Sequence, residues 1–195
     1  MRTDTPRLPP LKDEELDAEQ EEILGPFRAG GGAFNVARAF VRHPVALKAF
    51  RVWAGYVMMT PNPLQERERE IMALRTAWDI KCAYVWSRHL SYAAKAGLTD
   101  EEVEALKKPI DAHPWSEADA ALIAAADALT SDFFIPDDIW EVLARHFTDR
   151  QLMDAIFVVG HFVLMGSFIN AAGVPMDSDV PLDPDLDMRP KVAAE

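Results

Sequence analysis

The stretch from Glu66 to His89 constrains the fold most, because two helical patterns meet in it. Before the junction, apolar residues recur at the spacing of an α-helix: Leu64, Ile71, Leu74 and Trp78. After it, a second helical face follows: Cys82, Val85, Trp86, His89 and Ala93. The first pattern loses its register across residues 78–81. The sequence therefore predicts two antiparallel helices joined by a turn near residue 80.

Such a hairpin would bring three reactive side chains together. Glu70 lies ten residues before the predicted turn and His89 nine residues after it, so the two positions come out level. Cys82 begins the second helix, about two turns below His89 on the same face. At a helix N-terminus, the dipole and the free N–H groups favour a thiolate. We expect Glu70, Cys82 and His89 to form one catalytic site, in which Glu70 hydrogen-bonds His89 and His89 exchanges protons.

Each of these residues also has a simpler interpretation. A single cysteine is most often a small buried hydrophobic residue. One histidine on an apolar face is usually a core residue whose hydrogen bonds are satisfied, and we expect this of His161 in the long apolar segment 156–168. Glu70 ends a charged run that starts at Glu66, so it could be an ordinary solvated carboxylate. The spacing favours the functional interpretation, because paired titratable groups in a cleft mark sites.

The same residues resemble the signature of a known family. The carboxymuconolactone decarboxylases and the related alkylhydroperoxidase D-like proteins share a Glu, eleven residues, and then Cys-x-x-Cys-x-x-x-His, and the spacing of Glu70, Cys82 and His89 fits. Val85 stands at the second cysteine position, so the chain is similar to a branch that lacks the dithiol. Tyr84 stands where the peroxidase branch favours His. Segments 42–44, 97–102 and 170–177 are also similar, and the resemblance spans roughly residues 35–177.

The resemblance implies a cofactor-free enzyme of the lyase type found in aromatic degradation. Such an enzyme would use the three residues as a proton relay in decarboxylation, isomerisation or lactone chemistry on a small, anionic substrate. The resemblance also implies a homo-oligomer, a trimer or a hexamer. One alternative is a thiol peroxidase, which would need an external thiol because Val85 cannot resolve an oxidised Cys82. Another is an oligomeric binding module without catalysis.

Four further side chains near the hairpin are candidates for substrate binding. Tyr84 and Trp86 could wall a pocket, although aromatic residues at helical spacing more often belong to the core. Arg75 and Arg88 could hold an anion, because residues 63–97 are mildly basic in a protein of net charge −12. Neither HExxH nor CxxC occurs, and residues 30–32 lack the strand–glycine–helix context of a phosphate loop. We therefore expect no metal and no cofactor.

The whole chain favours an all-α fold, because no strand pattern survives beside the helical ones. We expect a compact helical domain of the alkylhydroperoxidase D-like type, built around the antiparallel hairpin. It would occupy residues 33–177, after an N-terminal arm and short acidic helix at 1–32 and before an extended tail at 178–195. The acidic helix should end at Gly25–Pro26, and Asn62 should cap the first hairpin helix.

Composition excludes several classes of function. The net charge of −12 argues against nucleic acid, whose phosphates need a basic surface. No apolar run is expected to reach the ~18–20 residues of a membrane span, and the polar N-terminus does not resemble a signal peptide. A single cysteine cannot form an internal disulfide, which fits a reducing cytoplasm.

Overall fold

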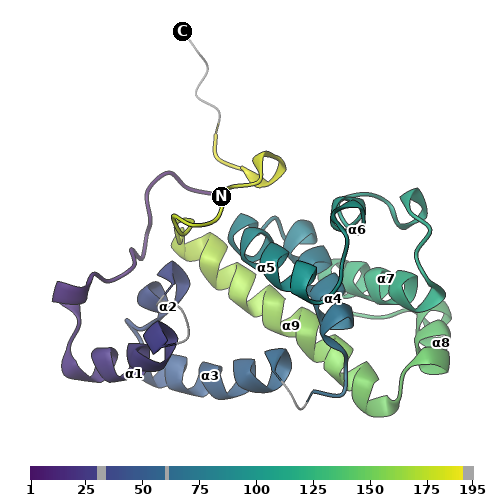
Figure 1. Cartoon of the computed structure of the whole chain (residues 1–195), viewed down its shortest axis with the longest axis horizontal. Coiled ribbons are helices and arrows are strands. Elements are labelled where there is room, and N and C mark those ends of the chain that lie inside the picture. Colours follow the sequence, from purple (N-terminus) through teal and green to yellow (C-terminus); the bar gives the residue numbers. More distant parts are fainter. Residues whose placement is uncertain (30–33, 60–61, 191–195) are drawn as a thin grey trace, which may run out of the picture.

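The computed structural model describes residues 1–29, 34–59 and 62–190, and these form an all-helical fold (Figure 1). The α-helices are α1 (Ala18–Ala29), α2 (Asn35–Phe40), α3 (Pro44–Met58), α4 (Glu66–Asp79), α5 (Ala83–Lys95), α6 (Asp100–Ala105), α7 (Glu117–Ser131), α8 (Asp137–His146) and α9 (Asp149–Ala172). Short 3-10 helices lie at Asp13–Glu15, Ile110–Ala112 and Pro184–Leu186. The described ranges contain no strand, so the all-α prediction is confirmed. Residues 30–32, which the sequence excludes as a phosphate loop, lie outside the described ranges.

The hairpin predicted around residue 80 is formed by α4 and α5. Lys81 adopts the left-handed conformation, with φ of 55°, which reverses the chain within three residues. Backbone bonds close the turn, because Lys81 N–H donates to the Trp78 carbonyl at 3.1 Å and Cys82 N–H to the Ala77 carbonyl at 2.8 Å. The hairpin packs against α7 on one side and α9 on another, and most of α4 is buried (Figure 1). The antiparallel pair is therefore the centre of the main hydrophobic core.

Helix α9 crosses the molecule between the hairpin and the layer of α2 and α3 (Figure 1). A capping box between Thr148 and Gln151 begins it, and Gly173, with φ of 68°, ends it. A methyl group at Gly166 would lie 2.2 Å from Ile80 Cδ1 and 3.4 Å from Cys82 Cβ. Glycine at this position therefore lets α9 pass close to the hairpin turn.

The sequence-based statement that no segment reaches membrane-spanning length is wrong for α9. By length and composition α9 qualifies, and it is the one helix in residues 1–29, 34–59 and 62–190 that does. More than half of its apolar stretch is buried inside the protein, however, and core helices of soluble proteins have the same properties. Its composition is explained by its place between two layers of helices.

The N-terminal arm packs on its own chain. Arg7 and Leu8 both donate their N–H groups to the Ala172 carbonyl, at 2.8 and 3.0 Å. The amino group of Met1 donates to the Leu186 carbonyl at 2.6 Å, and Met188 N–H donates to the Met1 carbonyl at 2.7 Å. The arm and the C-terminal segment thus lie together over the end of α9, close to the hairpin turn (Figure 1).

Two local predictions are wrong. Helix α1 does not stop at Gly25–Pro26 but continues to Ala29, with Pro26 inside it. Packing favours the continuation, because Phe27, after the proline, packs on the second small core that Ile23 and Leu24 form with α2 and α3. The N-cap of α4 is Gln65, which forms a capping box with Glu68, rather than Asn62. The Asn62 side chain instead accepts a hydrogen bond from Leu64 N–H at 2.9 Å.

A buried cluster of charges ties the end of α4 to α7. The Arg75 guanidinium donates to both carboxylate oxygens of Asp127, at 2.5 and 2.8 Å, and lies 3.5 Å from Asp79. The pKa of Asp79 is raised to about 6, first because the side chain is buried and second because Asp127 is near. The folded protein therefore favours the neutral form of Asp79. The contribution of neutral Asp79 to the free energy of unfolding is therefore fully present below pH 3.8 and is lost as pH rises through about 6.

We expect Asp79→Asn, which imitates the neutral form, to stabilise the protein only at higher pH. The free energy of unfolding in urea should rise by roughly 1–3 kcal/mol at pH 7.5 and change little near pH 4. Glu141→Gln, at an exposed position on α8, serves as the control and should show no such pH dependence. A loss of stability at pH 7.5 would show that attraction to Arg75 outweighs the cost of burying the charge.

Candidate functional site

The hairpin brings Glu70 and His89 into direct contact, as the sequence predicts. His89 Nδ1 lies 2.7 Å from Glu70 Oε2, and only 13% and 7% of the two side chains are exposed. The edge of Phe162 packs against the imidazole with a centroid distance of 4.8 Å, and Tyr92 lies against it at 5.3 Å. Since Glu70 occupies Nδ1, Nε2 is the ring nitrogen left for a ligand.

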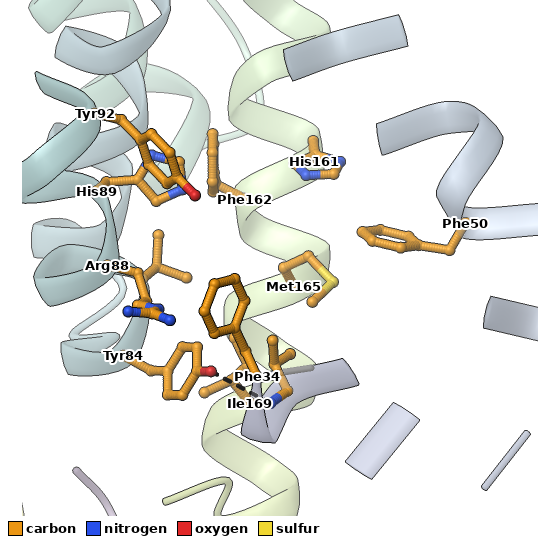
Figure 2. A pocket seen from close by; sticks show the side chains of 12 residues that line it. Phe34, Phe50, Tyr84, Arg88, His89, Tyr92, His161, Phe162, Met165 and Ile169 are labelled. Carbon is orange, nitrogen blue, oxygen red and sulfur yellow. Dashed lines mark hydrogen bonds between the residues drawn. The ribbon is translucent and has the colours of Figure 1, made fainter. Parts of the chain in front are cut away.

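A cavity of about 180 Å³ lies beside His89, between α5 and α9 (Figure 2). Its walls also come from α2, α3 and the residue before α2. Its lining is mostly aromatic or aliphatic: Phe34, Val36, Phe50, Tyr84, Val85, Arg88, His89, Tyr92, His161, Phe162, Met165 and Ile169. An apolar cavity of ~150 Å³ in another protein binds benzene. The cavity therefore has room for a molecule with one small ring.

A second cavity, of about 480 Å³, lies on the other side of the Glu70–His89 pair. Glu66, Arg69, Glu70 and Lys95 contribute charged groups to its lining, and His89 and Tyr92 line both cavities. His89 thus separates an apolar chamber from a more polar one.

Two of the predicted substrate-binding residues, Tyr84 and Arg88, line the apolar cavity. The Tyr84 hydroxyl donates to Asp177 and accepts from Val36 N–H at 3.3 Å. Burial and the Asp177 carboxylate both raise the pKa of Tyr84 far above its usual value, so the phenol stays neutral. Arg88 lies flat over the Phe34 ring, with Cζ 3.6 Å from the centroid, and pairs with Asp177 at 3.3 Å.

The expectation that Cys82 is a thiolate is wrong. Cys82 is the N-cap residue of α5, but it is fully buried, and burial raises the pKa of its thiol to about 11. Hydrogen bonds from the Val85 and Tyr84 backbone act in the opposite direction and are outweighed. Cys82 does not line the cavity beside His89. The structure thus joins Glu70 and His89 in one site and places the thiol in the core below them.

Arg75 and Trp86 are also not part of the site. Arg75 is held by Asp127 and by the carbonyls of Leu106 and Lys108, each at 2.8 Å, so its charge joins α4 to α7. Trp86 is buried in the core with its ring 5.7 Å from that of Trp78. Both residues therefore support the hairpin, and neither lines the cavity beside His89.

Sequence reasoning placed His161 in the core, whereas the structure shows that it lines the cavity. The ring is stacked on Phe50 with a centroid distance of 5.1 Å and an interplanar angle of 16°. Burial, and next the nearby His89, lowers the pKa of His161 to about 4. Its spacing from Met165 and Ile169 puts the three on one face of α9, which was the available signal. Within the described ranges, no group of three or more His, Cys, Asp or Glu side chains is arranged to hold a metal.

Comparison with known families agrees with this geometry. The model of the carboxymuconolactone decarboxylase family matches residues 44–128, which include Glu70, Cys82 and His89. Over residues 44–128 the chain is thus similar to the carboxymuconolactone decarboxylase family. The resemblance predicted from the spacing of these residues is therefore confirmed. No curated protein matches the chain.

Several solved structures share the fold of this carboxymuconolactone decarboxylase-like protein. An uncharacterized peroxidase-related protein with an alkylhydroperoxidase AhpD core, from Ralstonia eutropha JMP134, has a TM-score of 0.77 at 19% identity, covering 89% of this chain and 93% of that one. An uncharacterized peroxidase-related protein from Silicibacter sp. TM1040 has a TM-score of 0.72 at 23% identity, covering 91% and 92%. A cysteine-to-alanine variant of the debrominase Bmp8 in complex with 2,3,4-tribromopyrrole has a TM-score of 0.68 at 15% identity, covering 91% and 94%.

The burial of Cys82 predicts a slow thiol. We expect iodoacetamide to alkylate the native protein at pH 8 at least about 100-fold more slowly than it alkylates free cysteine. The rate should keep rising with pH and reach no plateau below pH 10, because the thiol pKa is about 11. The protein unfolded in guanidinium is the control and should react at the ordinary rate. A plateau below pH 9 would contradict the burial argument.

Proposed function

We propose that the protein is an enzyme that moves a proton on a small organic molecule bound in the cavity beside His89. The observation that carries this proposal is the buried hydrogen bond between His89 Nδ1 and Glu70 Oε2, 2.7 Å long, at the wall of an apolar cavity. A carboxylate on Nδ1 fixes the tautomer with its lone pair on Nε2, which is the arrangement of a general base. Family resemblance and enzymes among the fold neighbours support an enzyme.

The proposed reaction begins when His89 Nε2 takes a proton from the substrate. The imidazolium that forms is stabilised by the Glu70 carboxylate beside it. Returning the proton to a different atom of the substrate completes an isomerisation. The apolar lining beside the pair lowers the local polarity, which strengthens the charge interactions within it.

A thiol peroxidase receives less support from the same site. Peroxide reduction needs an accessible thiolate, whereas Cys82 is buried, does not line the cavity and keeps its proton at neutral pH. Val85, at the second cysteine position, has no thiol to resolve an oxidised Cys82. We therefore place the chemistry at His89 rather than at Cys82. Because the single cysteine is a free thiol, we also propose that the protein is cytoplasmic.

Removing either member of the pair should abolish most of the activity. Proton–deuterium exchange in D₂O, followed by NMR across a panel of single-ring carbonyl compounds, identifies a substrate. On that substrate, His89→Ala and Glu70→Gln should each lower kcat/KM by at least about 100-fold. The double variant should lose little more than the worse single variant, because the two residues act as a unit.

Two substitutions away from both cavities, Glu101→Gln and His113→Ala, are the controls and should retain activity. Circular dichroism of every variant checks that the helices remain. Full activity of either single variant would refute the proposed reaction. Losses that multiply in the double variant would refute the coupling of the two residues.

We also propose that the protein is a homo-oligomer, a trimer or a hexamer. Helices α3 and α9, and the residue that follows α3, expose large apolar side chains that a subunit interface would cover: Val52, Tyr56, Met59, Met153 and Leu164. At micromolar concentration, light scattering should give a multiple of the 21.8 kDa chain mass. Leu164→Glu should lower that mass, while Glu101→Lys on α6 should not. A monomeric parent protein would exclude the assembly.

A further inference from the structure

Two residues that line the apolar cavity each carry an unpaired, buried polar atom. Arg88 Nη2 and His161 Nδ1 are both buried, and neither has a hydrogen-bond partner in the described parts of the chain. Both residues line the cavity beside His89 (Figure 2). Native proteins rarely leave such atoms unpaired, because a buried polar group without a hydrogen-bond partner destabilises the fold. Two of them at one cavity indicate a ligand with two polar groups.

The charges around Arg88 favour an uncharged group at that end. Asp177 lies 3.3 Å from Nε and Asp179 lies 2.7 Å from Nη1, so two carboxylates already balance the guanidinium. Glu70, beside His89, adds a further acidic group near the cavity. A carboxylate ligand would lose its hydration in an apolar chamber without gaining net positive charge. A carbonyl oxygen can accept from Nη2 without that cost.

His161 provides the second polar contact. Only 6% of the residue is exposed, and its stacking on Phe50 fixes the ring plane. With its pKa lowered to about 4, the imidazole is neutral at pH 7, so one nitrogen donates and the other accepts. A hydroxyl group both donates and accepts, and it therefore fits Nδ1 in either tautomer.

We infer that the cavity binds an uncharged molecule with one small ring, a carbonyl-type acceptor for Arg88 Nη2 and a hydroxyl group for His161 Nδ1. The inferred ligand differs from the anionic substrate that the family resemblance implies, and the inference rests on the proposed function only in treating this cavity as the substrate site. His161 is thereby a residue that determines specificity. It contacts the ligand away from His89, which transfers the proton.

Three ligands of nearly the same shape test both contacts by calorimetric titration near pH 6.5. They are 4-hydroxyacetophenone, 4-methylacetophenone, which lacks the hydroxyl group, and 4-hydroxybenzoate, in which a carboxylate replaces the acetyl group. We expect 4-hydroxyacetophenone to bind tightest. The methyl compound should bind at least about 5-fold more weakly, and the carboxylate at least about 10-fold more weakly.

Variants assign each preference to its residue. His161→Leu should bring the ratio of hydroxyl to methyl binding close to one and leave the preference for acetyl over carboxylate unchanged. His161→Gln keeps a polar atom and should retain part of the hydroxyl preference. Asp179→Asn, on the exposed partner of Arg88, should improve carboxylate binding relative to acetyl binding.

The inference is overturned if 4-hydroxybenzoate binds as tightly as 4-hydroxyacetophenone, if the hydroxyl preference survives in His161→Leu, or if none of the three ligands binds the parent protein. The test is independent of turnover. Loss of the hydroxyl preference in His161→Leu together with full activity of His89→Ala would support the inference while refuting the proposed reaction. If instead the hydroxyl preference survives in His161→Leu and His89→Ala is inactive, His89 remains the catalytic residue and His161 does not bind the ligand.

Discussion

The tight turn between α4 and α5 determines the geometry of the whole site. Its left-handed residue, Lys81, and the bonds that Lys81 and Cys82 donate back to α4 fix how far the two helices are offset. One residue of offset would move a side chain by 1.5 Å along its helix and rotate it by about 100°. At that offset, Glu70 and His89 could not keep their 2.7 Å contact. A backbone feature thus sets the acid–base pair, and the pair in turn orients the imidazole toward the cavity.

Position in the chain decides which site residues the sequence could predict. Glu70 and His89 lie on adjacent helices joined by a short turn, so counting residues from the turn was enough to pair them. Arg75 is neutralised by Asp127, fifty-two residues away, and no local pattern shows that contact. The prediction of a thiolate at Cys82 was wrong for a similar reason. The effects of a helix end are local, whereas Cys82 is buried by α9, which approaches the turn at Gly166. The position of His161 at the cavity was not predicted, because the spacing of apolar residues shows which of them share a face of a helix but not what packs against that face.

Burial has opposite consequences for the two candidate reactive groups. Cys82 is fully buried, and the loss of hydration raises the pKa of its thiol, which therefore stays protonated. His89 keeps contact with two cavities and a carboxylate partner, so one nitrogen is oriented and the other is available. The same hairpin therefore favours imidazole chemistry over thiol chemistry. Family resemblance alone does not distinguish these two, because the signature contains both residues.

The close passage of α9 at Gly166 has a mechanical consequence. His161, Phe162, Met165 and Ile169 form one wall of the cavity and belong to one uninterrupted helix. Because α9 meets the hairpin turn at Gly166, where a methyl group would lie 2.2 Å from Ile80 Cδ1, this close approach sets how far the whole wall lies from the hairpin. The size of ligand that the cavity accepts therefore depends on how closely α9 approaches the turn.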